Sequence, residues 1–401
     1  MRKETRFQFN KYLSRIAELN GIEASDLDKK FTVEPSVTQT LFDKIQQSSS
    51  FLKLINMVTV SELTEEKVGI DVTGSIASTA DTDGGVERKT ADFAKLDAYR
   101  YFCHPVNFDY HLKYNKLDLW ARFQDFQIRI RNAIIKRQAL DYITIGFNGV
   151  SQAATSDRAQ NPLLQDVAVG WLQKYRNDAP ERVMSCITDD DGKVISDTIK
   201  IGSKDKGGHY ANLDAMVMDA FESLVAEIHR ENPEMVVICG RRILTDKYFP
   251  MINKFQANSE QLAGELIISQ KTIGQLQAVR APFFPANSVF ITTLDNISIY
   301  LYEDGHRRHI VENPKLDQVE NYEQVKVDFV IEDYEAGCLI ENIEILEQEE
   351  TATTEPVSAA VFAAEMVKAM QSLTGTAPAS APVADGETSP AETGTTDGVE
   401  A

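Results

Sequence analysis

The sequence predicts an α+β fold with an N-terminal arm, a long β-hairpin, a long helix and a mixed α/β body. Three features of the chain indicate it. Strand-like runs in residues 57–114 flank a small, polar stretch at 73–85. Residues 117–145 contain neither Gly nor Pro, which is typical of a continuous helix. Helical and strand patterns then alternate over residues 211–345.

The composition is that of a soluble globular chain with a strongly acidic surface. The 401 residues include 61 acidic and 41 basic side chains, giving a formal net charge of -20, and 43% are hydrophobic. Such a charge disfavours broad binding to nucleic acid or to anionic membranes. No apolar run is long enough to span a membrane or to form a signal peptide. If this chain encloses DNA, we expect it to act as a container.

The N-terminal residues predict two helices. Apolar side chains in residues 1–30 recur at three- and four-residue spacing, and Asn20-Gly21 is a stop signal. A second amphipathic helix is expected directly after Pro35. The first helix also carries several cations, namely Arg2, Lys3, Arg6, Lys11 and Arg15.

Residues 57–114 predict a long two-stranded excursion with a flexible tip. Strand character occurs around Val58, at 68–72, at 99–102 and at 106–110. The small polar residues between 73 and 85 cannot bury much apolar surface. Because an isolated hairpin is marginally stable in water, we expect this one to lie against another molecule.

The stretch 117–145 predicts the longest helix, with Gly146 and Gly149 as its terminators. At about 1.5 Å per residue it would measure roughly 40 Å. Two interpretations of its cations remain open, a solvated face or a contact with an acidic neighbouring subunit. The cations are Arg122, Arg129, Arg131, Lys136 and Arg137.

The body predicts a helix over 213–228, a buried strand over 235–239 and a further helix over 243–249. A hairpin turn is expected at 189–193. Later strands are expected at 266–268, 289–291, 297–302, 325–331 and 338–340. Residues 351–401 are acidic and rich in Thr, Ala, Pro and Gly, which predicts a disordered tail with one short helix near 357–370.

The sequence carries no motif of a nucleotide site, a nucleophile elbow or a metal site, so we predict no catalytic, cofactor-binding or metal-ligating residue. His306-Arg307-Arg308-His309 reads as a basic contact loop rather than a metal site, because two imidazoles are too few ligands. Adjacent Cys103 and His104 would point to opposite faces of a strand. All four cysteines, Cys103, Cys186, Cys239 and Cys338, are isolated, which favours reduced thiols.

Ten segments together carry a resemblance to a known family. They include Val72-Thr73-Gly74-Ser75-Ile76-Ala77-Ser78-Thr79 and lie at 6–7, 12–15, 29–37, 72–79, 117–122, 128–137, 164–174, 246–250, 306–308 and 312–317. They are similar to the major capsid proteins of peduovirus-type tailed phages, over about residues 1–345. That resemblance implies the Hong Kong 97-type capsid fold and a structural protein rather than an enzyme.

The resemblance also divides the chain. It implies a removable arm at 1–31, the arm of the mature subunit at 32–56 and an extended hairpin loop at 57–114. A peripheral domain with a spine helix would cover 115–210, an axial domain 211–295, and the return to the peripheral domain 296–350. The acidic tail, 351–401, has no counterpart in the family, and we expect it outside the shell because an inner acidic tail would repel DNA.

For function, the resemblance implies hexamers and pentamers on an icosahedral lattice. A precursor shell would assemble in the host cytoplasm around an internal scaffold, and a separate phage protease would cut near Phe31 and Thr32. The shell would then expand around double-stranded DNA and become part of the virion, with portal and head-completion proteins as further partners. Gly74, Ile76 and the five helix cations are expected at subunit contacts.

Three alternatives are weighed against this interpretation. A nanocompartment shell on the same fold would lack the removable arm and carry a cargo pocket. A cytosolic α/β enzyme would show converging perturbed carboxylates or histidines in a pocket. A minor virion protein is disfavoured by the length of the resemblance.

Overall fold

The computed structural model describes residues 1–72, 77, 94–120, 123, 125–189, 193–254 and 271–346. The chain forms two units, Met1–Glu347 and Gln348–Ala401, and every described residue lies in the first. Four predictions fall wholly or partly outside the described residues: most of the hairpin tip, residues 190–192 of the expected turn, the strand at 266–268, and the tail with its short helix.

The two N-terminal helices are confirmed. Helix α1 (Lys3–Leu19) stops at Asn20, and Gly21 takes a positive φ of 63°, which glycine adopts without steric cost. Helix α2 (Pro35–Ser48) has its proline in the first turn, where the missing N–H costs no helical bond. Between them lie the short helix η1 (Ala24–Asp26) and strand β1 (Phe31–Thr32), and η2 (Leu52–Leu54) follows α2.

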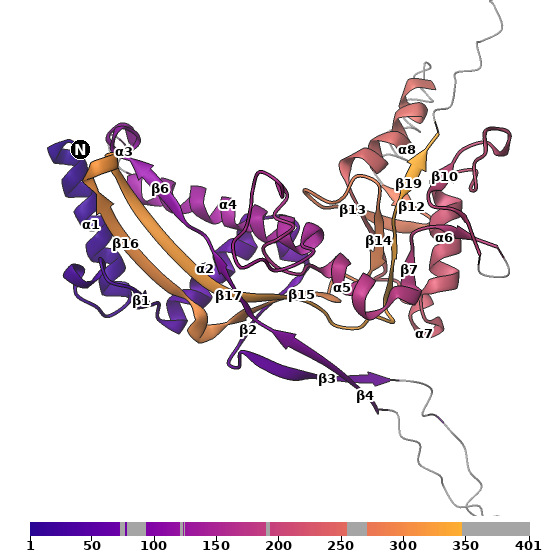
Figure 1. Ribbon diagram of the computed structural model, residues 1–401, viewed down its shortest axis with the longest axis horizontal. Coiled ribbons are helices and arrows are strands. Elements are labelled where there is room, and N and C mark those ends of the chain that lie inside the picture. Colours follow the sequence, from indigo (N-terminus) through magenta and orange to yellow (C-terminus); the bar gives the residue numbers. More distant parts are fainter. Residues whose placement is uncertain are drawn as a thin grey trace, which may run out of the picture. The chain divides into compact units, whose positions relative to one another are not determined.

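The larger sheet is organised around strand β17 (Gln318–Ile331), which is paired along both edges (Figure 1). Strands β16 (Arg307–Asn313), β15 (Ile297–Tyr302), β5 (His104–Asn107) and β6 (Tyr110–Lys113) all pair with it antiparallel. Strand β1 extends the sheet beyond β16, and β2 (Asn56–Val60) extends it beyond β15. The strands predicted at 297–302 and 325–331 are therefore confirmed.

Helices cover this sheet and form its core. Phe42 of α2, Tyr142 and Trp171 belong to one hydrophobic cluster with Phe329 of β17. Trp171 opens helix α5 (Trp171–Asp178), and its indole N–H donates to the Ser298 carbonyl oxygen at 3.0 Å. The polar end of this large buried side chain is thus paired, as burial requires.

The prediction of one continuous helix over 117–145 is wrong. The structure has α3 (Tyr114–Trp120) and α4 (Phe126–Asn148), and α4 begins beside Asp125, whose carboxylate accepts from Arg129 one turn later at 2.8 Å. The interruption contains neither Gly nor Pro, so no local stop signal marks it. An acidic side chain at a helix start is favoured by the helix dipole.

Gly146 does not terminate α4, although Gly149 does. A Cβ atom on Gly146 would lie 2.2 Å from Cζ3 of Trp171, far inside van der Waals contact. This glycine therefore permits the close approach of a helix and an aromatic ring rather than a change of chain direction.

The predicted hairpin is confirmed but is shorter than 57–114. Strands β3 (Thr64–Val72) and β4 (Ala94–Phe102) pair antiparallel with each other over their full length. Strands β5 and β6 instead pair with β17, and β2 pairs with β15. Backbone groups on both sides of the hairpin thereby gain partners in the larger sheet, which the alternation of side chains alone does not reveal.

The smaller body contains a six-stranded sheet. Its order is β12 (Thr272–Ile273), β13 (Leu276–Arg280), β11 (Val236–Cys239), β14 (Val289–Thr292), β18 (Gly337–Ile340) and β7 (Val183–Met184). Helix α6 (Leu213–Leu224) shares a hydrophobic cluster with it through buried side chains such as Met216 and Val217. Helix α8 (Arg241–Lys254) follows β11. The buried strand and the predicted strands at 289–291 and 338–340 are confirmed.

The helix predicted over 213–228 is divided. Helix α6 ends at Leu224 and α7 (Glu227–Arg230) follows, and two arginines bind carbonyl oxygens at this junction. Arg182 donates to the Leu224 oxygen at 2.5 Å and Arg230 to the Val225 oxygen at 2.9 Å. The turn predicted at 189–193 is flanked by the antiparallel pair β8 (Ile187–Thr188) and β9 (Val194–Ser196). Strands β10 (Ile199–Ile201) and β19 (Ile343–Ile345) pair in parallel.

Candidate assembly and processing sites

Helix α1 is packed against its own chain. Its buried residues Phe9, Ile16 and Ala17, with Leu27 after it, form one hydrophobic cluster with four residues from α3, α4, β16 and β17. These four are Leu117, Ile130, Ile310 and Val319, and we call them the arm-binding face. Phe9 is 4% exposed whereas Phe7, two residues earlier, is 59% exposed. The helix therefore has one buried face and one free face.

Polar contacts reinforce this packing. The Arg6 guanidinium binds both carboxylate oxygens of Glu312, at 2.5 and 2.7 Å, and the Tyr114 hydroxyl donates to Glu312 at 2.6 Å. The hydrogen bond from Arg6 outweighs partial burial and holds the pKa of Glu312 below its ordinary value of 4.5. The backbone N–H of Arg2 donates to Asp118 at 2.9 Å. The N-terminal end of α1 is thus anchored.

The predicted processing residues Phe31 and Thr32 lie in β1, paired antiparallel with Arg308 and Arg307 of β16. Neighbouring bonds extend this attachment, since Ile310 N–H donates to the Leu27 carbonyl at 3.1 Å and His309 Nε2 donates to the Asp28 carbonyl at 2.8 Å. Cleavage at this position remains a prediction.

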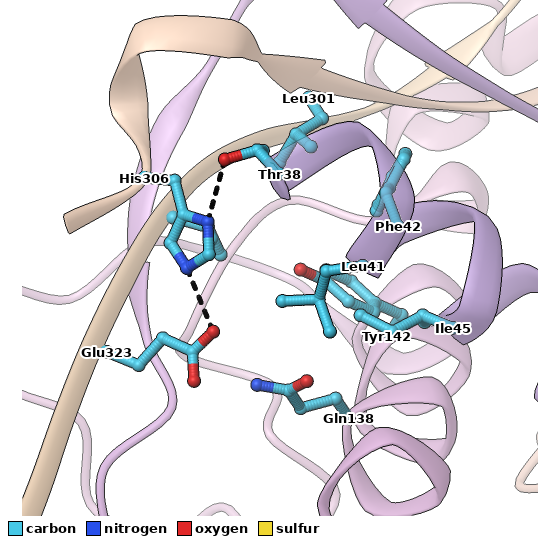
Figure 2. A pocket seen from close by; sticks show the side chains of 10 residues that line it. Thr38, Leu41, Phe42, Ile45, Gln138, Tyr142, Leu301, His306 and Glu323 are labelled. Atoms are coloured by element: carbon cyan, nitrogen blue, oxygen red, sulfur yellow. Dashed lines mark hydrogen bonds and ion pairs between the residues drawn. The ribbon is translucent and has the colours of Figure 1, made fainter. Parts of the chain in front are cut away.

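The tetrapeptide 306–309 is not a contact loop, which corrects the prediction. His306 is 1% exposed, and residues 307–309 begin strand β16. Figure 2 shows the His306 ring between Thr38 of α2 and Glu323 of β17. The distances are 3.0 Å from Nδ1 to the Thr38 hydroxyl and 2.9 Å from Nε2 to the Glu323 carboxylate.

Glu323 is buried yet ionised. Burial by itself raises its pKa, but the hydrogen bond from His306 and the charge of Arg308 outweigh this effect and hold the pKa below its ordinary value. An ionised carboxylate can only accept, so Nε2 of His306 carries a proton. Sequence reasoning missed this cluster, although a signal existed. Counting back by twos from inward-facing Val327 and Val325 of β17 turns Glu323 to the same face.

The predicted contact cations of α4 differ in their availability. Arg129 pairs with Asp125 at 2.8 Å and Arg137 pairs with Asp141 at 2.7 Å, both one turn apart in the same segment. Arg131 and Lys136 are exposed and form no ion pair with any residue of the described ranges. Arg122, Gly74 and Ile76 lie outside the described residues. Their role at subunit contacts remains a prediction.

The base of the β3–β4 hairpin is anchored by Asp328 of β17, which is 6% exposed. Its carboxylate accepts from the Phe102 backbone N–H at 3.1 Å, from Lys174 Nζ at 2.8 Å and from the Phe329 N–H at 2.8 Å. One buried carboxylate therefore joins the hairpin, helix α5 and the sheet. Such a group is costly to bury unless each of these partners is present.

Cysteine and metal chemistry find no support among the described residues. Burial raises the pKa of Cys103, Cys239 and Cys338 to about 12 each, which disfavours the nucleophilic thiolate. Within the described ranges, His, Cys, Asp and Glu side chains do not gather in threes as a metal site would need. No described helix combines the length and the hydropathy that a membrane crossing requires.

Comparisons with known proteins agree with this architecture. Residues 8–343 match the family described as "Phage major capsid protein, P2 family". The chain is 63% identical to the capsid protein of Escherichia phage P2 over 345 residues, which cover 86% of this chain and 96% of that one. It is 40% identical to the major capsid protein of Serratia phage KSP20, covering 87% and 99% of the two chains.

A solved structure of a relative matches the fold. The satellite phage P4 procapsid, determined with its size determination protein, contains a chain that is 58% identical to this one. The match has a TM-score of 0.71 and covers 86% of this chain and 99% of that chain. The predicted capsid fold is thereby confirmed.

Proposed function

The chain belongs to the P2 family of phage major capsid proteins, and from this membership we propose that it forms the hexamers and pentamers of an icosahedral head around double-stranded DNA. It is a capsid protein and a virion component, and its relatives are structural proteins. The identity of 63% to a phage capsid protein favours this function over a nanocompartment shell and over an α/β enzyme. A net charge of -20 fits a container that does not grip phosphates.

The chain is made as a precursor whose first residues are removed at Phe31–Thr32. Two observations support this part of the proposal. Helix α1 contacts the rest of the chain through one face only and contributes no strand to either sheet, so its loss breaks no strand pairing. Its other face exposes Lys3 and Lys11, which suit an acidic internal scaffold, although exposed ion pairs contribute only about 1 kcal/mol or less each.

Neighbouring subunits meet through the hairpin and the α4 cations. The β3–β4 pair has its own two-stranded sheet and would gain stability by lying on another subunit. Of the described cations on α4, Arg131 and Lys136 are the two available for an acidic neighbour, because Arg129 and Arg137 are already paired. Portal and head-completion proteins would close the head.

Electron microscopy of the chain expressed alone and with its scaffold and protease genes tests the proposal. Mass spectrometry of the particles gives the N-terminus of each subunit. We expect closed shells whose subunits begin at Thr32 when the protease is present, and at Met1 when it is inactive. Discrete small oligomers under every condition would contradict the shell. Shells whose subunits keep Met1 despite an active protease would contradict the trimming alone.

A further inference from the structure

Helix α1 packs with one apolar face on the arm-binding face, in the way that an amphipathic peptide binds a protein groove. Phe9, Ile16 and Ala17 are at most 7% exposed, and they pack against Leu117, Ile130, Ile310 and Val319, all of which belong to residues after the proposed cut. The spacing from Phe9 to Ile16 is two helical turns, as in amphipathic helices that lie in apolar grooves. Buried apolar side chains of the arm therefore meet apolar side chains from beyond the cut.

Polar anchors occur at the N-terminal end and in the middle of the same helix. Asp118 accepts hydrogen bonds from the Arg2 backbone N–H and from the Thr5 side chain. Glu312 holds Arg6 in a bidentate pair. The Arg308 guanidinium lies 3.3 Å from the Tyr12 hydroxyl. These contacts set the position of the helix along the face, which apolar packing alone would leave less defined.

The covalent link contributes little to this attachment. Lys29 and Lys30 are exposed, and Lys29 pairs only with nearby Asp26. The contacts after Leu27 are few, namely the Asp28 carbonyl with His309 and the short strand β1. Cutting near residue 31 would therefore lower the effective concentration of the arm but remove none of its main contacts.

We propose that the arm-binding face, with Asp118, Glu312 and Arg308 at its edge, is a peptide-binding site that keeps residues 1–30 bound after the chain is cut. Its biological meaning rests on the proposed trimming, but the binding itself does not. Cutting and release are then separate steps. A change in β16, β17, α3 or α4, the elements that form the face, would weaken the binding and favour release.

The test uses the full chain with a recognition sequence for a site-specific protease inserted between Lys30, which is exposed, and Phe31, the first residue of strand β1. The cut protein is passed over a size-exclusion column at micromolar concentration in native buffer. It is then challenged with labelled synthetic peptides of residues 1–30 carrying the natural sequence, Phe9→Ala or Phe7→Ala. Only the peptides vary, so every comparison uses the same folded body.

We expect residues 1–30 to co-elute with the cut chain and to exchange with the natural peptide. The Phe9→Ala peptide should bind at least about a hundredfold more weakly, since it loses a buried ring. The Phe7→Ala peptide should stay within about threefold of the natural one, because that ring is exposed.

Immediate loss of the arm on the column would overturn the proposal, as would equal weakening by the two substitutions. Neither result depends on whether the phage protease cuts at Phe31–Thr32, because the inserted site supplies the cut. Conversely, particles that keep Met1 would refute the trimming while leaving the peptide-binding site to be judged by this experiment.

Discussion

His306 joins the second N-terminal helix to the large sheet through two hydrogen bonds, one to Thr38 and one to Glu323. All three side chains are at most 4% exposed. Without the imidazole, the Glu323 carboxylate would keep the charge of Arg308 and the hydrogen bond from Gln138 but lose the hydrogen bond from His306. A buried charge deprived of a partner is among the most destabilising changes in a protein interior.

His306→Ala should therefore lower the free energy of unfolding of the unassembled subunit by about 3 kcal/mol. Urea denaturation at neutral pH followed by fluorescence measures this change. The matched control is His111→Ala, because His111 is exposed, and it should stay within about 0.5 kcal/mol of the natural chain. Equal effects of the two substitutions would show that the buried hydrogen bonds carry no special weight.

Attachment of the arm should depend on pH through Glu312. The hydrogen bond from Arg6 lowers the pKa of Glu312 when the arm is docked, so the docked state binds fewer protons than the free state. The contribution of Glu312 to docking is complete above its ordinary pKa of 4.5. It is lost as the pH falls through the lower pKa that Glu312 has in the docked state. Retention of the cut arm should fall across this acidic window, and Glu312→Gln should weaken retention at neutral pH while flattening the dependence. An unchanged acid profile in Glu312→Gln would contradict this assignment.

Helix α4 and helix α5 approach each other closely because Gly146 lacks a Cβ atom. Alanine in a helix is normally favoured over glycine by about 1 kcal/mol. At position 146 the added carbon would lie 2.2 Å from the Trp171 ring, so the steric cost should exceed the gain in propensity. We expect Gly146→Ala to destabilise the subunit by about 2 kcal/mol in thermal unfolding. In a double-mutant cycle, Trp171→Phe should relieve part of this loss, and purely additive effects would contradict the clash.

The β3–β4 hairpin is oriented by Asp328, which binds the Phe102 N–H, Lys174 and the Phe329 N–H together. Asp328→Ala leaves the half-buried Lys174 and two backbone donors without this acceptor. We expect a loss of about 3 kcal/mol and faster hydrogen exchange at the Phe102 amide. Asp295→Ala is the control, because Asp295 is exposed, and it should leave both measurements unchanged. Undiminished protection of Phe102 in Asp328→Ala would rule out this anchoring role.

Assembly of many copies should amplify the weak charge contacts of α4. The double variant Arg131→Glu and Lys136→Glu removes two exposed cations that have no ion pair with the described residues, so subunit stability should change by less than about 0.5 kcal/mol. If an acidic neighbour faces them, shell yield by electron microscopy should fall severalfold, since each contact contributes up to about 1 kcal/mol. If shell yield and subunit stability both stay normal, these cations belong to a solvated face and make no subunit contact.

Local patterns determined much of this protein by themselves. Dihedral preference explains the end of helix α1 at Asn20-Gly21 and the start of helix α2 at Pro35. Side-chain periodicity explains the buried strand at Val236–Cys239 and the hairpin strands. The spread of matching segments also identified the family, because ten separated stretches are far more specific than one motif.

Only the tertiary structure decided where those elements join. It paired β5 and β6 with β17, 200 residues away or more, and it divided the long helix without any Gly or Pro. It also buried His306 against Glu323 and gave Gly146 its role opposite Trp171. These outcomes depend on contacts between residues distant in the chain, which periodicity cannot specify because it reports only which face of an element is apolar.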